Sequence, residues 1–392
     1  MAGQSLITLN AGSSSVKFAI FASEGGDPEA VYRGQVAGIA RDGRFEVVQA
    51  DGGSVIDEAL DAPDHAAAIA RILDWVETAP GLPPLAAAGH RVVHGGMAFT
   101  EPVIVNAANL EQFAELEPLA PHHQPHNVAA IRAVAQRLPA LPQVACFDTE
   151  FHARQPEVAR QTGLPHRYWE RGIRRYGFHG ISYEAIVGRF PEVTGKPLPE
   201  KLVVAHLGNG ASMCAVQQGR SIATTMGFST IDGIPMGTRS GAIDPGALVY
   251  VARDEHLSIE QLADLLYDRS GLLGISEVAP EMHRLLSSDA PGAREAIDFF
   301  CYRINRELGS LAAALGGLDA LVFTGGIGEN AAPVRDTVCR HAAWLGIELD
   351  EAANEQGGPM ISTETSPAGV WVIPTDEEGV IAGHTLRLIG AG

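Results

Sequence analysis

Apolar and polar residues alternate in two stretches within residues 5–21, and a polar segment separates the stretches. This pattern predicts two strands joined by a turn over residues 10–15, which are Asn, Ala, Gly and three Ser. Backbone N–H groups and hydroxyls of such a turn can converge on an anion, and Lys17 adds a cation. The spacing differs from a Walker A loop, and a strand follows in place of a helix. The pattern therefore favours a phosphate-binding hairpin, with an ordinary hairpin turn as the alternative.

The same pattern recurs half a chain later, in residues 201–216. A shift of 198 positions places Gly210 on Gly12 and Ser212 on Ser14. Two such hairpins indicate an internal duplication, and they predict two related domains that each offer a phosphate-binding turn to a shared cleft. Residues 320–330 add an apolar strand and a third glycine-rich turn, and a helical pattern follows. That order is typical of phosphate bound at a helix N-terminus.

Hydrophobic periodicity predicts the elements of the remaining chain. We expect helices, the first of them capped by Asp64, over residues 64–77, 127–138, 246–269 (two helices), 292–315 and 380–389. We expect strands over residues 30–36, 44–50, 86–97 (entering a turn), 143–148 and 370–374. Residues 375–378 are typical of a turn. Residues 221–245 are rich in glycine, and a segment of this length without regular structure predicts a functional loop.

Composition limits the class of protein. The chain has 392 residues, more than the roughly 250–300 that one hydrophobic core supports, so two domains are expected. Its net charge of −19 argues against nucleic acid and anionic membranes as partners. No apolar run approaches the ~18 residues of a membrane span. The four cysteines have no CxxC spacing, which predicts reduced thiols and a cytoplasmic location.

Charged residues with a possible chemical role stand in or beside the apolar segments. Arg91 lies inside an apolar run, where it requires either a structural ion pair or a bound anion. Arg239 is the one cation of the 221–245 loop, Asp148 ends a predicted strand, and His179 and His206 lie at turns. Phosphoryl transfer needs such cations, together with positioning and a divalent metal. Asn10 and Glu377 offer hard oxygen ligands of the kind that can hold Mg²⁺ directly or through water.

Eight motifs along the chain resemble those of the acetate kinase family in order and approximate spacing: LNAGSSSVKF, HRVVHGG, FDTEFH, RRYGFHG, AHLGNGAS, MGTRSG, GGIGEN and IPTDEE. The resemblance implies an α/β fold of two duplicated actin-like (ribonuclease H-like) α/β domains around a nucleotide cleft. One domain would comprise residues 1–148 with a C-terminal helix, 380–392. The other would comprise residues 149–379 and carry the nucleotide site and the interface of a homodimer.

The resemblance also implies an activity and assigns residues to it. The family transfers the γ-phosphoryl group of ATP in line to acetate, reversibly and with Mg²⁺ or Mn²⁺, giving acetyl phosphate and ADP. Catalytic residues would be Arg91, Asp148, His179 and Arg239. The acyl group would contact Arg91, Val93, His122, Phe178 and Thr230. Nucleotide would contact Ser13, Ser15, Lys17, His206, Leu207, Gly208, Asn209, Gly210, Glu281, Met282, His283, Gly326, Ile327, Gly328 and Asn330.

Three departures from the family pattern leave finer questions open. His122 and Thr230 stand where related members often carry Leu and Pro, so the acyl group can be acetate, propionate or a more polar acid. Glu281-Met282-His283 replaces a stretch that usually holds an Arg toward the ribose, and Asp376 replaces an Asn beside the metal ligands. The alternatives are another short-chain carboxylate kinase, a sugar kinase, or a non-catalytic actin-like ATP switch.

Overall fold

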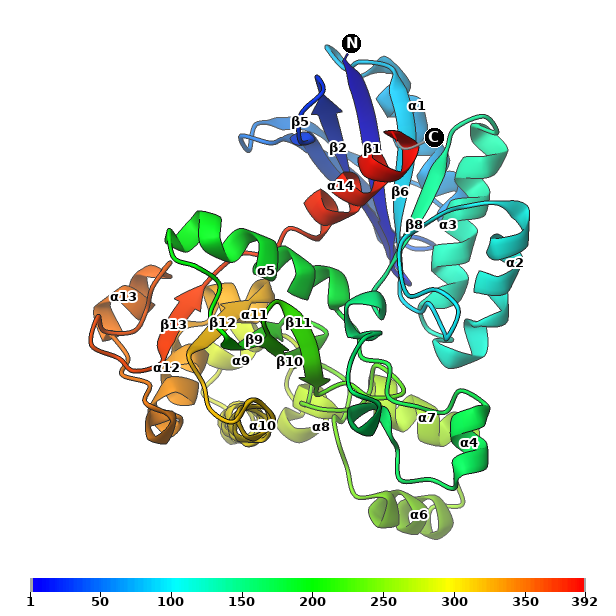
Figure 1. The fold of residues 1–392 in the computed structure, drawn as a ribbon. Helices are drawn as coiled ribbons and strands as arrows, with labels where there is room; N and C mark the ends of the chain where they lie inside the picture. Colours follow the sequence, from blue (N-terminus) through cyan, green and yellow to red (C-terminus); the bar gives the residue numbers. More distant parts are fainter. Residues whose placement is uncertain (1–2, 391–392) are drawn as a thin grey trace. The chain divides into compact units, whose positions relative to one another are not determined.

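The computed structural model describes residues 3–390 and divides into two compact units (Figure 1). One unit comprises Met1–Glu150 with Asp376–Gly392, and the other comprises Phe151–Thr375. The predicted domain ends at residues 1 and 392 lie outside the described residues. Among residues 3–390, no helix has both the length and the apolar character that a membrane crossing requires.

The first unit is built on an eight-stranded sheet with the order β5-β4-β3-β2-β1-β6-β8-β7. Its strands are β1 (Gln4–Ala11), β2 (Ser15–Ser23), β3 (Glu29–Ala37), β4 (Gly43–Gln49), β5 (Ser54–Leu60), β6 (Leu85–Val92), β7 (Val103–Ile104) and β8 (Gln143–Phe147). Its helices are α1 (His65–Thr78), α2 (Ala107–Glu115), α3 (Gln124–Arg137) and α14 (Glu377–Gly390), with a 3₁₀ turn at Glu117–Leu119.

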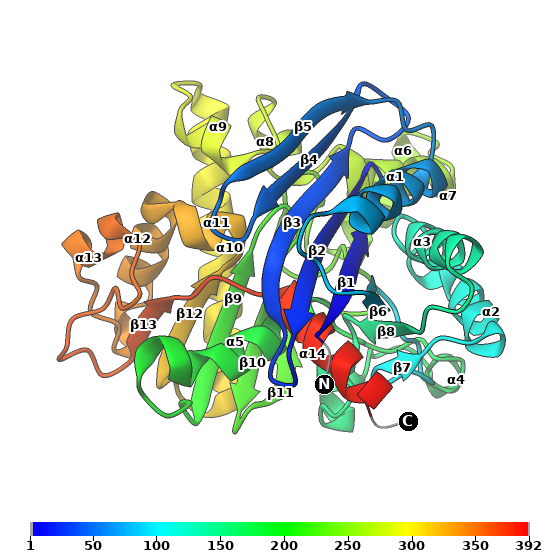
Figure 2. The ribbon, with the colours of Figure 1, turned by 90° about the horizontal axis from the view of Figure 1, so that it is seen from above.

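Alternation along the strands decides which helix covers which face of this sheet. Ile7 and Ala88 belong to the cluster that contains the apolar residues of α1 and α3, whereas Leu6 and Ala87 pack with those of α14. Figure 2 shows α1 and α3 along one side of the β1–β6 strands. Arg91 lies four residues after Ala87 on the same strand, so its side chain points to the same face of the sheet, which α14 covers.

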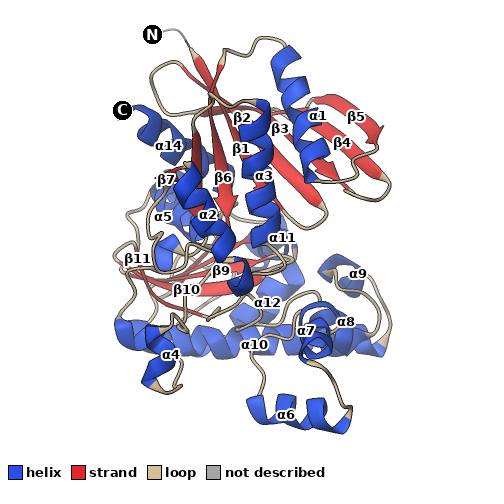
Figure 3. Cartoon of the chain, turned by 90° about the vertical axis from the view of Figure 1, so that its right-hand side faces the viewer, coloured by secondary structure: helices blue, strands red, loops and turns tan. Residues whose placement is uncertain are grey.

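The second unit contains a five-stranded sheet with the order β11-β10-β9-β12-β13. Its strands are β9 (Lys201–Leu207), β10 (Ala211–Gln217), β11 (Arg220–Thr224), β12 (Ala320–Thr324) and β13 (Gly369–Val372). Its helices are α4 (His166–Glu170), α5 (Gly180–Thr194), α6 (Pro245–Asp254), α7 (Ile259–Asp268), α8 (Gly271–Ser276), α9 (Met282–Leu286), α10 (Pro291–Leu315), α11 (Gly325–Asn330), α12 (Ala332–His341) and α13 (Glu351–Gln356). Short 3₁₀ turns cover Glu150–His152, Glu157–Arg160 and Ala343–Leu345. Apolar residues of α5 pack on one face of this sheet, and the long helix α10 runs along the other (Figure 3).

The two sheets repeat one pattern. In each, a strand (β1 or β9) pairs antiparallel with the strand that follows it and parallel with a later strand (β6 or β12). That later strand pairs in parallel with a fourth, β8 or β13. The duplication indicated by the two hairpins is therefore confirmed by topology, and both units have the actin-like α/β fold.

Two expectations about local structure are wrong. The glycine-rich segment after β12 is a short helix, α11, and not a turn. Glu377 and Glu378 begin α14 and are not part of a turn, because the backbone N–H of Val380 already donates to the Asp376 carbonyl. The irregular loop is confirmed over residues 225–244, although residues 221–224 belong to β11.

Candidate functional site

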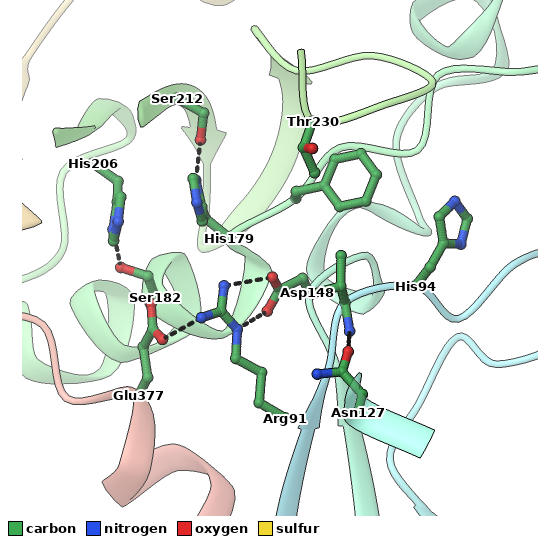
Figure 4. Close-up of polar contacts among 12 residues, drawn as sticks. Arg91, His94, Asn127, Asp148, His179, Ser182, His206, Ser212, Thr230 and Glu377 are labelled. Atoms are coloured by element: carbon green, nitrogen blue, oxygen red, sulfur yellow. Dashed lines mark hydrogen bonds and ion pairs between the residues drawn. The ribbon is translucent and has the colours of Figure 1, made fainter. Parts of the chain in front are cut away.

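An ion pair of the first unit joins the carboxyl ends of two neighbouring strands. Arg91, near the end of β6, donates from Nε to Asp148 Oδ1 at 2.8 Å and from NH2 to Oδ2 at 2.7 Å (Figure 4). Asp148 follows β8 directly, and only 2 % of its side chain is exposed. A third interaction links Arg91 NH1 to Glu377 of α14 at 3.6 Å. The geometry is a bidentate, charge-assisted pair that holds the guanidinium in one orientation.

Electrostatics at this ion pair favour the charged arginine. Burial acts to lower the pKa of Arg91, but Asp148 and Glu377 outweigh it and raise that pKa above its ordinary value. The start of α14 adds two further acids. Asp376 pairs with Arg33 at 3.3 Å, and burial, together with the neighbouring Glu377 and Asp376, raises the pKa of Glu378.

This group of acids fits a divalent cation. Carboxylates crowded at the start of α14 repel one another, and a hard cation relieves that repulsion. Glu377 is largely buried, and Asn10 lies half-buried near the end of β1. Both supply oxygen atoms of the kind that Mg²⁺ prefers. The donor set therefore suits the metal, and the assignment of these two residues stays a prediction.

The first predicted phosphate turn is shorter than the polar segment of the sequence suggested. Asn10 belongs to β1 and Ser15 to β2, so the turn itself is residues 12–14, closed by the Gly12 N–H donating to the Ser15 carbonyl at 2.8 Å. Ser13 and Lys17 are exposed, and Ser15 is half-buried. His65, which sequence reasoning missed, donates from Nε2 to the Gly12 carbonyl at 2.6 Å.

Two residues of the predicted acyl pocket lie in the first unit. Val93 is buried directly after β6, and His122 is exposed before α3. Their role toward an acyl group stays a prediction.

Two stacked histidines form the centre of the second unit's candidate site. His179 and His206 have ring centroids 4.3 Å apart and planes inclined by 22°. His179 Nδ1 is hydrogen-bonded to Ser212 at 2.8 Å, and His206 Nδ1 to Ser182 at 2.8 Å (Figure 4). Hydrogen bonds between these serine hydroxyls and the Nδ1 atoms therefore orient both rings. Sequence reasoning missed Ser182, whereas Ser212 stood in the repeated hairpin.

The backbone at His179 is unusual. Its φ is 59°, in the left-handed region, where it caps α5. The preceding residue, Phe178, is buried, and its carbonyl accepts a hydrogen bond from His152 Nε2 at 3.0 Å. Burial lowers the pKa of His152 to about 4, so this ring is a neutral donor at pH 7. His152 was also missed as a supporting residue.

The irregular loop brings Arg239 beside the second turn. Arg239 NH1 donates to the carbonyl of Thr230 at 3.2 Å, and the Thr230 side chain is buried. A Cβ added to Gly210 would lie 3.1 Å from His179 Nε2 and 4.0 Å from Arg239 NH1. Four predicted residues of the second unit, His179, His206, Gly210 and Arg239, are therefore brought together.

Other predicted nucleotide residues occupy three places in the second unit. Leu207 ends β9 and is buried, Gly208 follows it, and Asn209 is exposed at the turn. A Cβ on Gly208 would lie 3.9 Å from the Gly326 nitrogen, so this turn adjoins α11, which contains Gly326, Ile327, Gly328 and Asn330. At the start of α9, Glu281 and His283 are exposed and Met282 is buried, and their role toward the nucleotide stays a prediction.

Comparisons with known proteins show the family of this chain. The sequence profile of the acetokinase family matches residues 5–383. An acetate kinase of Rhodopseudomonas palustris is 50 % identical over 99 % of both chains, and one of Methylocella silvestris is 47 % identical over 98 % of both. Among solved structures, a propionate kinase from Francisella tularensis superposes with a TM-score of 0.92 at 35 % identity, covering 98 % of this chain and 100 % of that chain. The acetate kinase of Porphyromonas gingivalis gives 0.87 at 34 %, with the same coverage.

The fold and these likenesses define a phosphotransferase that uses a carboxyl group as acceptor, built on the duplicated actin-like fold. More narrowly, the chain belongs to the acetokinase family.

Proposed function

We propose that this chain transfers the γ-phosphoryl group of ATP to acetate, reversibly and by direct in-line displacement. A carboxylate oxygen attacks the γ-phosphorus, the bond to the β–γ bridging oxygen breaks, and ADP leaves with that oxygen. Acetate is ionised at pH 7, so the reaction needs no general base. The observation that carries the proposal is the bidentate hold of Asp148 on Arg91 within a chain of this family.

The energetic difficulty of this reaction is the approach of two anions. In the proposal, Arg91 binds the acetate carboxylate, and Asp148 keeps the guanidinium oriented. Arg239 and His179 stabilise charge on the transferring phosphoryl group. Arg91 belongs to the first compact unit and Arg239 to the second.

Binding of the two substrates is assigned to the remaining predicted residues. Val93, His122, Phe178 and Thr230 contact the acyl group. ATP phosphates contact Ser13, Ser15 and Lys17 of the first hairpin and residues 206–210 of the second. The nucleoside contacts Gly326, Ile327, Gly328 and Asn330 of α11, together with Glu281, Met282 and His283 at the start of α9.

A divalent cation, Mg²⁺ or Mn²⁺, completes the proposed site, held by Asn10 and Glu377. When bound, it neutralises phosphate charge. The protein's own contribution is the crowded set of acids at the start of α14, together with Arg91 for the acceptor carboxylate.

We further propose a homodimer in the cytoplasm. Helices α6 and α7 contain no buried residue, and their exposed apolar side chains include Val249 (51 % exposed), Tyr250 (68 %) and Ile259 (78 %). A second copy of the chain is the partner that buries this face. Buried cysteines without CxxC spacing support a reducing compartment.

The test is acyl phosphate formation from ATP and Mg²⁺, trapped with hydroxylamine, with acetate, propionate, butyrate and glycolate in parallel. We expect acetate to give the highest kcat/KM. Preference for propionate would support the second candidate, which the likeness to the Francisella propionate kinase favours. ATP binding without turnover on any acid would refute the kinase and leave a nucleotide switch.

A further inference from the structure

The neighbouring strands β1 and β6 separate at their carboxyl ends. Their parallel pairing extends to Leu9 and His90, although β1 continues to Ala11 and β6 to Val92. Beyond that point the backbone groups of the two strands require other partners, because buried N–H and C=O groups are rarely left without one. These ends lead into the first phosphate turn and into Val93 of the predicted acyl pocket.

One side chain bridges the separated strands. Asn127 of α3 accepts a hydrogen bond from the Val93 N–H at 3.0 Å (Figure 4). It also donates from Nδ2 to the Ala11 carbonyl at 2.9 Å. It is 2 % exposed, and its carboxamide acts as an inserted peptide group between the two strands. The Ala11 contact joins residues 116 positions apart in the sequence.

We propose that Asn127 is a positioning residue, which sets the distance between the first phosphate turn and the acyl-binding end of β6. This inference rests on the proposed function. Both of its partners are backbone atoms beside predicted substrate residues, so its loss displaces the acceptor relative to the phosphate. Displacements of about 1 Å are enough to lower turnover by about 100-fold.

A matched control exists in the same unit. Asn109 of α2 has the same bonding pattern, because its Oδ1 accepts from the Asn106 N–H at 2.8 Å and its Nδ2 donates to the Ile104 carbonyl at 2.8 Å. Both partners of Asn109 are local, within five residues. Substitution of Asn109 therefore tests the cost of losing a buried carboxamide without moving strand ends that carry site residues.

The experiment compares Asn127→Ala, Asn127→Asp and the two corresponding Asn109 variants. We expect Asn127→Ala to lower kcat/KM for acetate by about 10- to 100-fold, while Asn109→Ala changes it by less than about 3-fold. In Asn127→Asp the side chain keeps the acceptor for Val93, and only its protonated form can donate to the Ala11 carbonyl. Burial raises the pKa of such a carboxyl, so its kcat/KM, relative to wild type, rises as the pH falls.

Hydrogen exchange separates this inference from the proposed function. The Val93 amide should lose protection in Asn127→Ala and keep it in Asn109→Ala, whichever substrate the protein uses. Unchanged exchange at Val93 would overturn the inference. So would equal kinetic losses in the two Ala variants at equal thermal stability. If the wild-type protein forms no acyl phosphate, the proposed function fails while the exchange result still stands.

Discussion

Replacement of Arg91 separates two roles that one residue can have, in folding and in phosphoryl transfer. Asp148 is almost fully buried and is held bidentately by this arginine. Arg91→Leu removes that counter-charge and leaves the carboxylate in a poorly solvated place. Removing one partner of a buried ion pair typically costs about 3–5 kcal/mol. We therefore expect the free energy of unfolding of the first unit to fall by about that amount.

A double variant restores one property and not the other. In Arg91→Leu/Asp148→Leu an apolar pair replaces the ion pair, and such replacements are often neutral or stabilising. Turnover should stay about 100-fold or more below wild type in both variants, since Arg91 orients the acceptor carboxylate and a misplacement of about 1 Å can cost about 100-fold.

The assay combines two measurements of stability, urea-induced unfolding and hydrogen exchange in β6 and β8, with a measurement of turnover, hydroxamate formation at saturating substrates. Arg44→Leu is the control, since Arg44 pairs with Asp57 at an exposed position, where loss of the pair should change stability little. Recovery of turnover together with stability in the double variant would refute the reasoning. Arg91 would then serve the fold alone.

Three further predictions follow from the second unit and from buried histidines. His179→Asn should leave the free energy of unfolding nearly unchanged because Asn tolerates a φ of 59°, whereas His179→Val should lower it by about 1–3 kcal/mol in urea unfolding. Both variants should lose turnover by about 100-fold or more. Equal stability of the two variants would contradict the strain argument. Gly210→Ala should raise KM for ATP by roughly 10-fold because the added Cβ meets His179. Gly188→Ala is the control, because there is open space around Gly188 and KM should not change. Similar KM values for the two variants would contradict this prediction. Burial lowers the pKa of His90 and His152 to about 4, below the unfolded value near 6.5, so the unfolded chain binds more protons between these pH values. The free energy of unfolding should therefore decrease as the pH falls from about 6.5 to 4, by about 3 kcal/mol per histidine. His152→Gln should reduce the slope of the free energy of unfolding against pH, measured by urea titration at each pH.

The sequence predicted most of the strands that carry the site, because their apolar alternation is local information. Alternation also predicted the repeated hairpin, which topology confirms. It did not predict β5, whose residues are all exposed or half-buried and which forms through pairing with β4. A strand that covers little apolar surface leaves no periodic pattern to detect.

Helix α11 shows why long-range contacts escape a local interpretation. Its glycine-rich sequence has poor intrinsic helix propensity. In the structure, the Glu329 side chain accepts from the Gly325 N–H at 2.9 Å, and Arg335 donates to the carbonyls of Gly328 and Glu329. Partners at both ends of this short helix thus compensate for its composition. The start of α14 was missed for the opposite reason, since acidic residues suit a turn and a helix N-terminus equally well.

Supporting residues of the site were missed because their partners lie far along the chain. His65 reaches the Gly12 carbonyl across 53 positions, and the His152 bond to the Phe178 carbonyl spans 26. Neither contact has a periodic or motif-like signal. Residues with chemistry of their own, such as Arg91, stand out in a sequence, whereas residues that orient them do so only through the fold.

The histidines beside the two hairpin turns do not occupy equivalent positions in the duplicated units. In the first unit, the imidazole at the turn comes from His65, which begins α1, a helix that follows the hairpin. In the second unit, it comes from His179, which caps α5, a helix that precedes the hairpin. The helices are not equivalent in the repeat, so the two imidazoles do not correspond to each other in the duplication. One ring donates to a backbone carbonyl and stabilises the turn, whereas the other faces Gly210 and Arg239, where phosphoryl charge is expected. Under the proposed function, the ring of the second unit would stabilise charge on the transferring phosphoryl group, whereas the ring of the first unit fixes the backbone of its own turn.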